Sequence, residues 1–247
     1  MNFKHLISRH FLNIPGWRTN RKIVVIESDD WGSIRLSSKS AYAQLKSLGF
    51  QLDGIVYNRY DALESEPDLQ MLFETLYELK DKHGHPAVIT ANTIMTNPDF
   101  EKIAESKFEE YHFEYFTDTY KKYPEHQRSF DLLKQGIDSG LMRPQFHGRE
   151  HLNINRWMRA LQSGRENVML AFNHGMYDLS TSVRITEDSF METLNYIHEQ
   201  ELEDQKRALS EGLNIFEQLF GFRSTTFIAP CYIWSNKLNE TLLMSGI

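Results

Sequence analysis

Cysteine is nearly absent from this chain: Cys231 is the only one among 247 residues. One thiol cannot form an intrachain disulfide, and it cannot supply a zinc site made of several cysteines. A low cysteine content also suits a reducing compartment. On this basis we expect a cytoplasmic protein.

Long apolar runs are missing as well. Residues 1–17 carry positive charge, but Ser8, Arg9 and His10 interrupt their apolar pairs. We therefore expect neither a signal peptide nor a transmembrane span. A surface helix is the expected structure of this segment, and the alternative is a short amphipathic segment that touches a membrane or a partner.

Positive charge is not clustered anywhere. The chain has 27 Lys and Arg residues against 34 Asp and Glu residues, which gives a formal net charge of −7. Binding of nucleic-acid phosphates needs grouped Lys and Arg side chains. We therefore expect no nucleic-acid partner.

Apolar residues are plentiful enough for one large domain that spans residues 1–247. Hydrophobic residues make up 40% of the chain and aromatic residues 13%, so a sizeable core can form. No internal repeat, low-complexity tract or obvious linker divides the sequence. The length suits a barrel of alternating strands and helices.

Predicted strands alternate with predicted helices along the chain. Strands are predicted at residues 22–28, a continuous apolar run that ends in polar residues, and at residues 87–95, 143–146, 167–172 and 225–229. Helices are expected at residues 40–49, 67–84, 98–107, 129–141, 154–161, 186–220 and 236–244, with an irregular aromatic insertion at 111–123. This order is typical of parallel α/β proteins, and we expect a distorted or incomplete (β/α) barrel.

Polar side chains follow four of the predicted strands. In β/α barrels the carboxyl ends of the strands form the active-site face. The side chains expected at that face are Asp29 and Asp30, Asn92 and Thr93, His147, and His174. Chemistry from distant parts of the sequence is therefore expected to converge on one rim.

Asp29 and Asp30 stand next to each other at the end of an apolar run. Two adjacent carboxylates repel each other, and a divalent cation can relieve this by binding one of them. The other carboxylate is then free to act as a base. The alternative is structural, because an Asp after a strand often caps the next helix.

His147 and His151 lie four residues apart. Together with Asp30 they supply two imidazoles and one carboxylate, a set typical of catalytic zinc sites with an open position. A surface turn with two solvated histidines is the alternative. The same five residues also fit the His-x-x-Glu-His pattern of zinc peptidases with Glu150 as base, although Gly148 argues against the helix that this pattern needs.

These motifs resemble those of the polysaccharide deacetylases, carbohydrate esterase family four. Ser28-Asp29-Asp30-Trp31-Gly32 is similar to the first family motif, and the resemblance implies Asp29 as catalytic base and Asp30 as metal ligand. His147-Gly148-Arg149-Glu150-His151 is similar to the second motif, with Gly148 in place of a hydroxyl residue. Ala229-Pro230-Cys231-Tyr232 partly matches the third motif.

The chain departs from the family pattern in its last part. Ile228 stands where the family has an Arg that orients the base, and Cys231 stands where it has an aromatic residue. The last two family motifs, which supply an acidic residue and a histidine acid, have no counterpart. We therefore expect a fragment that lacks a final strand or strands, with an open sheet edge near its C-terminus.

The function expected from these residues is metal-dependent removal of acetyl groups from an N- or O-acetylated oligo- or polysaccharide. One divalent cation is expected, with zinc favoured over other first-row metals. Asp29 is expected to take a proton from water, the backbone N–H of Cys231 to hold the oxyanion together with the metal, and His174 to be the one visible candidate for the acid.

Substrate contacts are expected from aromatic side chains and one arginine. These residues are Trp31, Tyr232, Trp234 and Arg149, of which Arg149 could replace the missing family arginine. Two other classes of function stay open. One is a different hydrolase on the same scaffold, a glycosidase or a peptidase, and the other is a non-catalytic carbohydrate-binding protein that retains the metal site.

Overall fold

The computed structural model describes residue 11, residues 14–180 and residues 189–247. Most of the segment expected to be an N-terminal surface helix lies outside the described residues, as does the beginning of the helix expected from residue 186.

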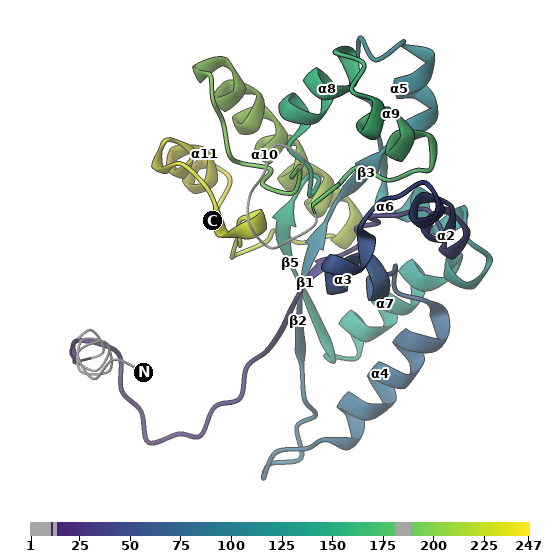
Figure 1. Cartoon of the computed structure of the whole chain (residues 1–247). Helices are drawn as coiled ribbons and strands as arrows, with labels where there is room; N and C mark the ends of the chain where they lie inside the picture. The colour runs from purple at the N-terminus through teal and green to yellow at the C-terminus, as the bar shows by residue number, and fades with distance from the viewer. Residues whose placement is uncertain (1–10, 12–13, 181–188) are drawn as a thin grey trace.

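Three parallel strands form the centre of the fold (Figure 1). They are β1 (Ile26–Trp31), β2 (Ile89–Ile94) and β5 (Met142–Gly148), in the spatial order β1-β2-β5. Ile89 of β2 is in register with Ile26 of β1 and with Met142 of β5. The carboxyl ends of all three strands therefore meet at one edge of the sheet.

Helices and one small hairpin surround this sheet. The hairpin pairs β3 (Thr96–Pro98) with β4 (Phe113–Tyr115) in antiparallel fashion. The helices are α2 (Lys39–Ser47), α3 (Val56–Tyr60), α4 (Glu66–Glu78), α5 (Phe100–Glu105), α6 (Phe116–Lys121), α7 (Ser129–Asp138), α8 (Ile154–Gln162), α9 (Glu166–Asn173), α10 (Glu199–Phe220) and α11 (Asn239–Met244). Short 3₁₀ turns lie at Leu52–Gly54, Pro124–His126, Pro230–Tyr232 and Asn236–Leu238.

Local sequence signals account for several helix ends. Ser65 and Asp68 form a capping box at the start of α4, and Ser38 caps α2 through its side chain. Helix α10 ends at Gly221, whose φ of +76° is a left-handed conformation that glycine adopts without steric cost.

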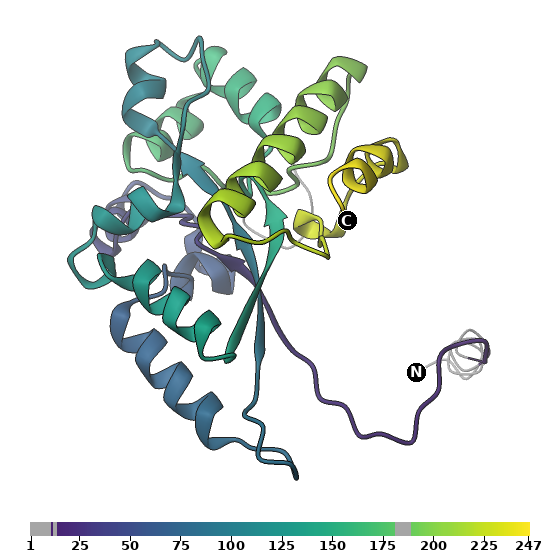
Figure 2. The same cartoon turned by 180° about the vertical axis from the view of Figure 1, so that it is seen from behind.

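Two apolar cores hold these elements together. The first joins the sheet to helices α4, α7 and α10, and its fully buried members include Phe146 of β5 and Phe216 of α10. Figure 2 shows α10, in green, across the face of the sheet that points away from the viewer in Figure 1. The second core joins α2, α5, α8 and α9 around the buried Trp157, beyond the carboxyl ends of the strands.

The α/β class predicted from the sequence is confirmed, but a closed barrel is not formed. Among the described residues the parallel sheet has three strands and two edges, β1 and β5. Helices fill the space around it instead of further strands.

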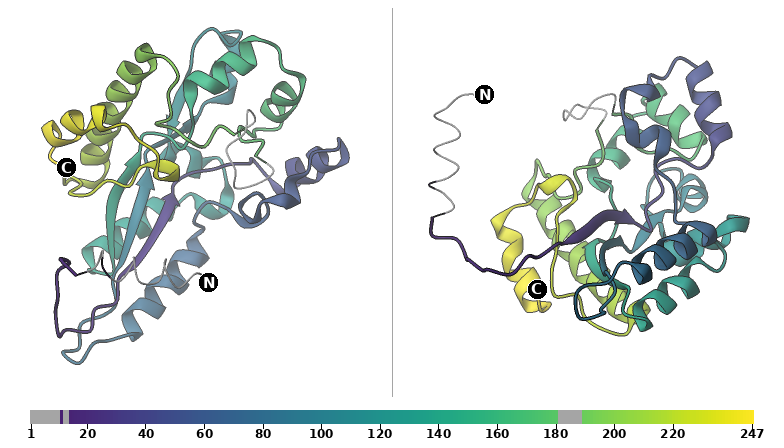
Figure 3. Two further views of the ribbon diagram at one scale, coloured as in Figure 1. Left: turned by 60° about the vertical axis from the view of Figure 1, so that its left-hand side comes forward. Right: turned by 90° about the horizontal axis from the view of Figure 1, so that it is seen from below.

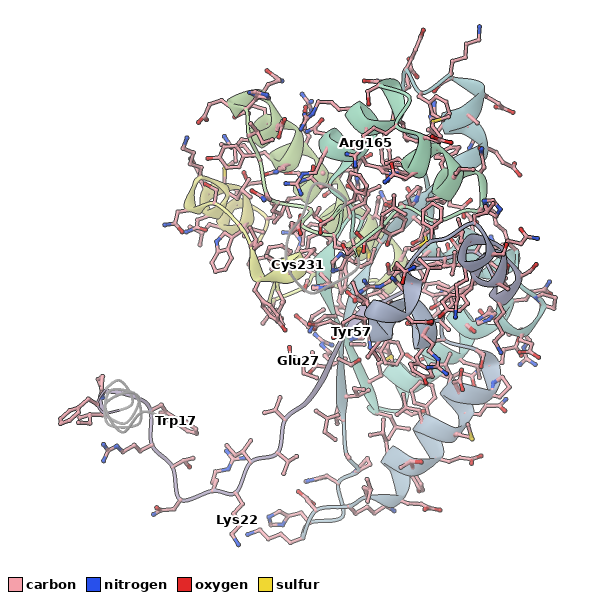
Figure 4. The ribbon with its side chains drawn as sticks, viewed as in Figure 1. Trp17, Lys22, Glu27, Tyr57, Arg165 and Cys231 are labelled. Carbon is pink, nitrogen blue, oxygen red and sulfur yellow. The ribbon has the colours of Figure 1, made fainter. Side chains whose placement is uncertain are left out.

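The strand predicted at residues 22–28 begins late. Strand β1 starts at Ile26, and the preceding Val24 and Val25 are 87% and 71% exposed. Figure 1 and Figure 3 show this stretch running away from the rest of the molecule, and Figure 4 shows Trp17 and Lys22 on it. An apolar run predicts burial, but β2 begins only at Ile89, the partner of Ile26, and offers no neighbour to the earlier residues.

Two other predicted strands are wrong. Residues 167–172 lie in helix α9, where Val168, Ala171 and Phe172 are buried at helical spacing. Residues 225–229 form no strand and contribute one isolated bridge, between Phe227 and Phe146.

The predicted helices lie close to helices of the structure, but their lengths differ. Helix α4 stops at Glu78, and the helix expected from residue 186 begins at Glu199 in the described part of the chain. The aromatic insertion at 111–123 contains β4 and α6. No helix in the described ranges combines the length and the apolar character that crossing a bilayer requires.

Candidate metal centre

A bulge in β1 brings both aspartates to one side of the sheet. Ser28 pairs with Ala91 and Trp31 pairs with Thr93, so β1 takes three steps where β2 takes two. Asp30 adopts a φ of +66° at this point. Adjacent side chains of a regular strand point to opposite faces, and a bulge changes this alternation. Asp29 and Asp30 therefore line the same cavity.

A second bulge lies at the end of β5. Phe146 pairs with Thr93 and Gly148 pairs with Ile94, which leaves His147 as the extra residue. Gly148 has a φ of +143°, and a Cβ atom there would come within 3.3 Å of the Glu150 carbonyl oxygen. A residue with a side chain is therefore disfavoured at position 148, which accounts for the glycine in the second motif.

Asp30, His147 and His151 come together at the carboxyl ends of these strands. One ligand atom from each lies within 4.8 Å of the other two. The Nε2 atoms of both histidines are 3.2 Å from Asp30 Oδ1. The two histidines are 2% and 5% exposed. The structure thus brings the three predicted ligands to one point.

Hydrogen bonding determines which nitrogen of His147 faces that point. Its Nδ1 donates to the carbonyl oxygen of Ile228 at 2.8 Å, and a carbonyl can only accept. In the neutral tautomer that this bond selects, Nε2 is an acceptor directed at a carboxylate oxygen, another acceptor. A cation between the two removes the repulsion, so the donor set fits a bound metal.

His151 fits the same interpretation. Burial lowers the pKa of its imidazole to about 4, against the opposing charge of Asp30. The ring is therefore neutral near pH 7, as a metal ligand must be. Its Nδ1 atom is buried without a hydrogen-bond partner among the described residues.

Arg35 holds the third ligand. Its Nη2 lies 2.8 Å from Asp30 Oδ2, and its Nε lies 2.6 Å from Asp61 Oδ2. Burial raises the pKa of Asp30, but the charge that His151 carries at low pH, the contact with His147 and the charge of Arg35 outweigh it and hold this pKa well below its usual range. Asp30 is therefore ionised, with one oxygen toward Arg35 and the other toward the histidines.

Asp29 stays outside this set of ligands. Its Oδ1 accepts a hydrogen bond from Asn92 Nδ2 at 2.7 Å, and its Oδ2 lies 3.4 Å from the Tyr232 hydroxyl. It caps no helix, because Ser38 is the cap of the next helix, α2. A free carboxylate thus lies in the same cavity as the triad.

The cavity around these groups has a volume of about 480 Å³. Figure 4 shows Tyr57 and Cys231, which both line it. Other lining side chains are Arg35, Asp61, Asp178, Glu192 and Tyr232.

Three of the five non-glycine residues with a positive φ in the described part of the chain line this cavity, while Lys107 and Phe108 lie elsewhere. Asp30, Cys231 and Tyr232 have φ values of +66°, +55° and +57°, and all three line it. Such conformations cost about 1–3 kcal/mol each and persist where the surroundings enforce them, often at functional sites.

Gln145 connects the histidine strand to the segment that carries Ile228. Its Oε1 accepts hydrogen bonds from the backbone N–H groups of Thr225 and Thr226, both at 3.0 Å. Gln145 is 4% exposed and lies two residues before His147. This contact holds residues 224–228 beside β5. The Ile228 carbonyl oxygen then lies within hydrogen-bonding distance of His147 Nδ1.

Several predicted site residues lie elsewhere. His174 follows helix α9, where its Nδ1 is 2.8 Å from the Leu170 carbonyl oxygen, and it lines a different cavity beside Ser37. Arg149 pairs with Glu150 and Glu211 in a third cavity.

The three aromatic residues predicted to contact substrate lie in different places. Trp31 packs against the first core, and Trp234 is 51% exposed with its Nε1 donating to Asn239. Tyr232 is 73% exposed and lines the metal cavity. Of the four predicted substrate contacts, Tyr232 is the one that the structure brings to this cavity.

The backbone geometry of residues 147–151 does not fit the zinc-peptidase interpretation. Residues 147–151 form the end of a strand and a loop, and no long helix carries the two histidines. Glu150 is 1% exposed and bonds Arg149 and Thr96. It lines the third cavity instead of the metal cavity.

Sequence reasoning missed Arg35, Asp61, Gln145 and Asp178. Arg35 and Asp61 belong to no motif, since their contact with Asp30 exists only in the folded chain. Gln145 did carry a signal, because it lies in the predicted strand 143–146, two residues before His147.

Comparison with known proteins adds little to this description. No protein-family model and no curated protein matches the chain. A solved structure of IcaB from Ammonifex degensii aligns with 91% of this chain and 82% of its own, at 9% identity and a TM-score of 0.33. A score this low assigns neither a fold nor a function to the chain.

Proposed function

We propose that this chain is a metal-dependent hydrolase that removes acetyl groups from an N- or O-acetylated carbohydrate. The observation that carries the proposal is the convergence of Asp30, His147 and His151, with Asp29 free in the same cavity. This division into three ligands and one base is what the resemblance to polysaccharide deacetylases implies for these residues. The proposed unit is a single domain spanning the chain.

Two imidazoles and one carboxylate suit zinc and also other first-row divalent cations. A cation held by these residues would supply Lewis-acid chemistry, polarising a carbonyl and lowering the pKa of water from 15.7 toward about 7. Arg35 keeps Asp30 ionised and oriented, and the Ile228 carbonyl accepts from Nδ1 of His147, which leaves Nε2 to face the cation.

Asp29 is the proposed base. The hydrogen bond from Asn92 fixes its side chain, and Asn92 itself is fully buried. A carboxylate held in this way takes a proton from the attacking water as the carbon–oxygen bond forms. The Tyr232 hydroxyl lies 3.4 Å from the other oxygen of Asp29.

Cys231 is proposed to act through its backbone. Although the residue is exposed, desolvation of its sulfur in the cavity and the charge of Glu192 raise the pKa of its thiol to about 11. The thiol therefore stays protonated near pH 7 and is no nucleophile. Its backbone N–H is the proposed donor to the oxyanion, and one such donor typically contributes about 3 kcal/mol.

The leaving group needs a proton, and His174 lies in a different cavity. Asp178 is a better placed donor, because it lines the metal cavity and is 1% exposed. Burial raises the pKa of its carboxyl group, which makes the protonated form more available near neutral pH. We assign it as the proposed acid.

Sugar stacking is assigned to the aromatic rings at the cavity mouth. Tyr57 and Tyr232 line the cavity and are 55% and 73% exposed. Exposed aromatic faces beside polar groups suit the apolar face of a sugar ring. Trp234, which is also exposed, is a proposed outer contact.

Acetate release tests the proposal. The purified chain, loaded with zinc, should release acetate from acetylated amino-sugar oligomers, and Asp29→Asn should lose this activity while keeping the metal. Asp81→Asn, which changes an exposed aspartate outside the cavity, is the matched control. New reducing ends without acetate would indicate a glycosidase, and sugar binding with no turnover would indicate the non-catalytic alternative.

A further inference from the structure

One stretch of the chain stands apart from the rest of the molecule: residues 14–25, the arm that leads into β1 (Figure 1). Every residue of this arm is exposed, and it forms no helix or strand. Figure 3 shows the same separation from two further directions. Among the described residues its side-chain hydrogen bonds stay within the arm, such as the one from Arg18 to the Ile14 carbonyl oxygen. The side chains of the arm are therefore accessible to a partner.

Charge also distinguishes this end of the chain. No Asp or Glu precedes Glu27, and residues 1–26 hold five of the 27 Lys and Arg residues. The remaining 22 stand against all 34 Asp and Glu in residues 27–247. The five cations form no continuous run, and the excess of positive charge arises because no carboxylate lies between them. A positive arm is thus joined to an acidic body.

Three of these cations, Arg18, Arg21 and Lys22, belong to the described arm. The ion pairs between described residues all lie within residues 30–237, so none of them involves these three side chains. Figure 4 shows Lys22 on the arm, well before β1 begins. The positive charge of the arm is therefore not neutralised by the described body, and it is available to an anionic partner.

Large apolar side chains are exposed beside these charges. Trp17 is 78% exposed, Phe11 65% and Ile14 55%. Trp is enriched at the headgroup level of bilayers, because its ring is apolar and its N–H is polar. Segments that lie on a membrane combine such apolar side chains with Lys and Arg, and they bind through buried apolar area and through attraction to anionic lipids.

A lipid surface matches this composition better than a nucleic acid does. Bases stack on aromatic rings, but the exposed aliphatic side chain of Ile14 gains nothing from stacking. Nucleic-acid binding also depends on many phosphate contacts, and the arm offers few cations. The headgroup region of a bilayer accepts the aliphatic side chain, the aromatic rings and the cations together.

The acidic body does not prevent such contact. An anionic surface repels it, but this repulsion is screened beyond about 8 Å at physiological ionic strength. An extended chain rises at most about 3.5 Å per residue, so residues 14–25 can span about 40 Å. The arm can therefore reach a surface while the body stays outside the range of strong repulsion.

We propose that the arm docks on the surface of a bilayer that contains anionic lipids. The three apolar side chains enter the headgroup region, and the three cations bind the lipid phosphates and carboxylates. The arm lies on the surface, and no described helix could cross the bilayer. The inference does not depend on the proposed function, because no residue of the arm lines the metal cavity.

The test is co-sedimentation of the full chain with vesicles of phosphatidylcholine that contain about 30% phosphatidylserine. Replacing Arg18, Arg21 and Lys22 together with Gln should weaken this binding about 100-fold, since each cation near such a surface contributes about fivefold. Trp17→Ser should weaken it about 10-fold by removing apolar area, and it should abolish the blue shift of Trp fluorescence that vesicles cause. Raising the salt concentration should weaken binding of the original chain.

The matched control replaces Lys39, Lys82 and Lys134 with Gln. These exposed lysines belong to the body, so this variant has the same net charge as the arm variant and should bind vesicles nearly as well as the original chain. Both variants should release acetate from soluble oligomers as the original chain does. Acetate release and vesicle binding are measured separately, so either proposal can fail without the other.

Several results would overturn the proposal. One is the absence of binding to the anionic vesicles at low salt, and another is equal vesicle binding by the arm variant and the body variant. Tighter binding of single-stranded RNA than of vesicles would assign the arm to a nucleic acid. A dimer in vesicle-free solution that the arm variant loses would assign it to the acidic body of a second copy.

Discussion

His147 donates from Nδ1 to the backbone carbonyl of Ile228 at 2.8 Å. This bond turns the other ring nitrogen toward Asp30. Ile228 stands where the resemblance to the deacetylases would place an arginine, and its backbone carbonyl orients one of the proposed metal ligands. A positive charge does reach Asp30, and it comes from Arg35.

Gln145 should prove to be a positioning residue for the metal centre. Gln145→Leu removes the acceptor for two backbone N–H groups, so residues 224–228 and the Ile228 carbonyl should shift. We expect the metal affinity to fall about 10- to 100-fold, as is usual when the orientation of a ligand is lost. Competition with a fluorescent zinc chelator measures it.

Gln145→Glu keeps an acceptor oxygen and is the matched variant. It should retain most of the metal affinity that Gln145→Leu loses. Equal losses in both variants would indicate a general effect on folding instead of positioning.

His147→Ala should abolish metal binding. With one of three ligands gone, metal analysis should show almost none bound, against about one ion per chain in the original protein. His174→Ala changes a histidine in another cavity and should keep the full content. A His147→Ala protein that still holds one ion would rule out the triad.

Asp29→Asn should separate binding from catalysis. Asparagine keeps the shape and an acceptor for Asn92 but cannot take a proton, so acetate release should drop about 10²- to 10⁴-fold with unchanged metal content. Tyr232→Phe, which removes only the hydroxyl 3.4 Å from Asp29, should have a much smaller effect. Unchanged acetate release in Asp29→Asn would refute its role as base.

Sequence patterns predicted that Asp30, His147 and His151 come together, because Asp30 ends an apolar run beside a second aspartate and the two histidines lie four residues apart. The same reasoning failed at residues 167–172, where a short apolar run suits a buried strand and a helix face equally well. It failed again at residues 225–229, where the Gln145 side chain accepts from the backbone N–H groups of Thr225 and Thr226. These donors are therefore not available to pair with a neighbouring strand. The Asp30–Arg35–Asp61 contact could not be predicted, since no local spacing encodes it.

Acid should destabilise the metal-free protein in a defined window. Burial lowers the pKa of His151 from 6.5 to about 4, so the folded state binds this proton more weakly than the unfolded state. Stability from this group is complete above pH 6.5 and is lost as the pH falls to about 4, by about 3 kcal/mol. Asp30, whose pKa is held low, adds a loss of the same sign at lower pH.

Thermal melts of chelated protein between pH 8 and pH 4 measure this loss. A His151→Asn variant removes the titrating group and should flatten the curve between pH 6.5 and pH 4. Identical pH profiles for the variant and the original chain would show that His151 does not titrate as its burial requires.

Asp178→Asn tests the proposed acid. The asparagine oxygen can still accept from Ser180 Oγ and Phe190 N–H, which Asp178 Oδ1 binds at 2.8 and 3.0 Å, so the local structure should hold. The lost proton should lower kcat about 10²-fold or more on substrates with a poor leaving group. Aryl acetates have a good leaving group that needs no proton, so their hydrolysis should change little.

The pH profile gives an independent check of the same residue. Burial raises the pKa of Asp178, and an acid must be protonated to act, so kcat should fall as the pH rises through that pKa. Asp178→Asn should remove this alkaline limb. If Asp178→Asn slows the hydrolysis of aryl acetates as much as that of substrates with a poor leaving group, the proton comes from another group in the cavity. The same conclusion follows if this variant keeps the alkaline limb.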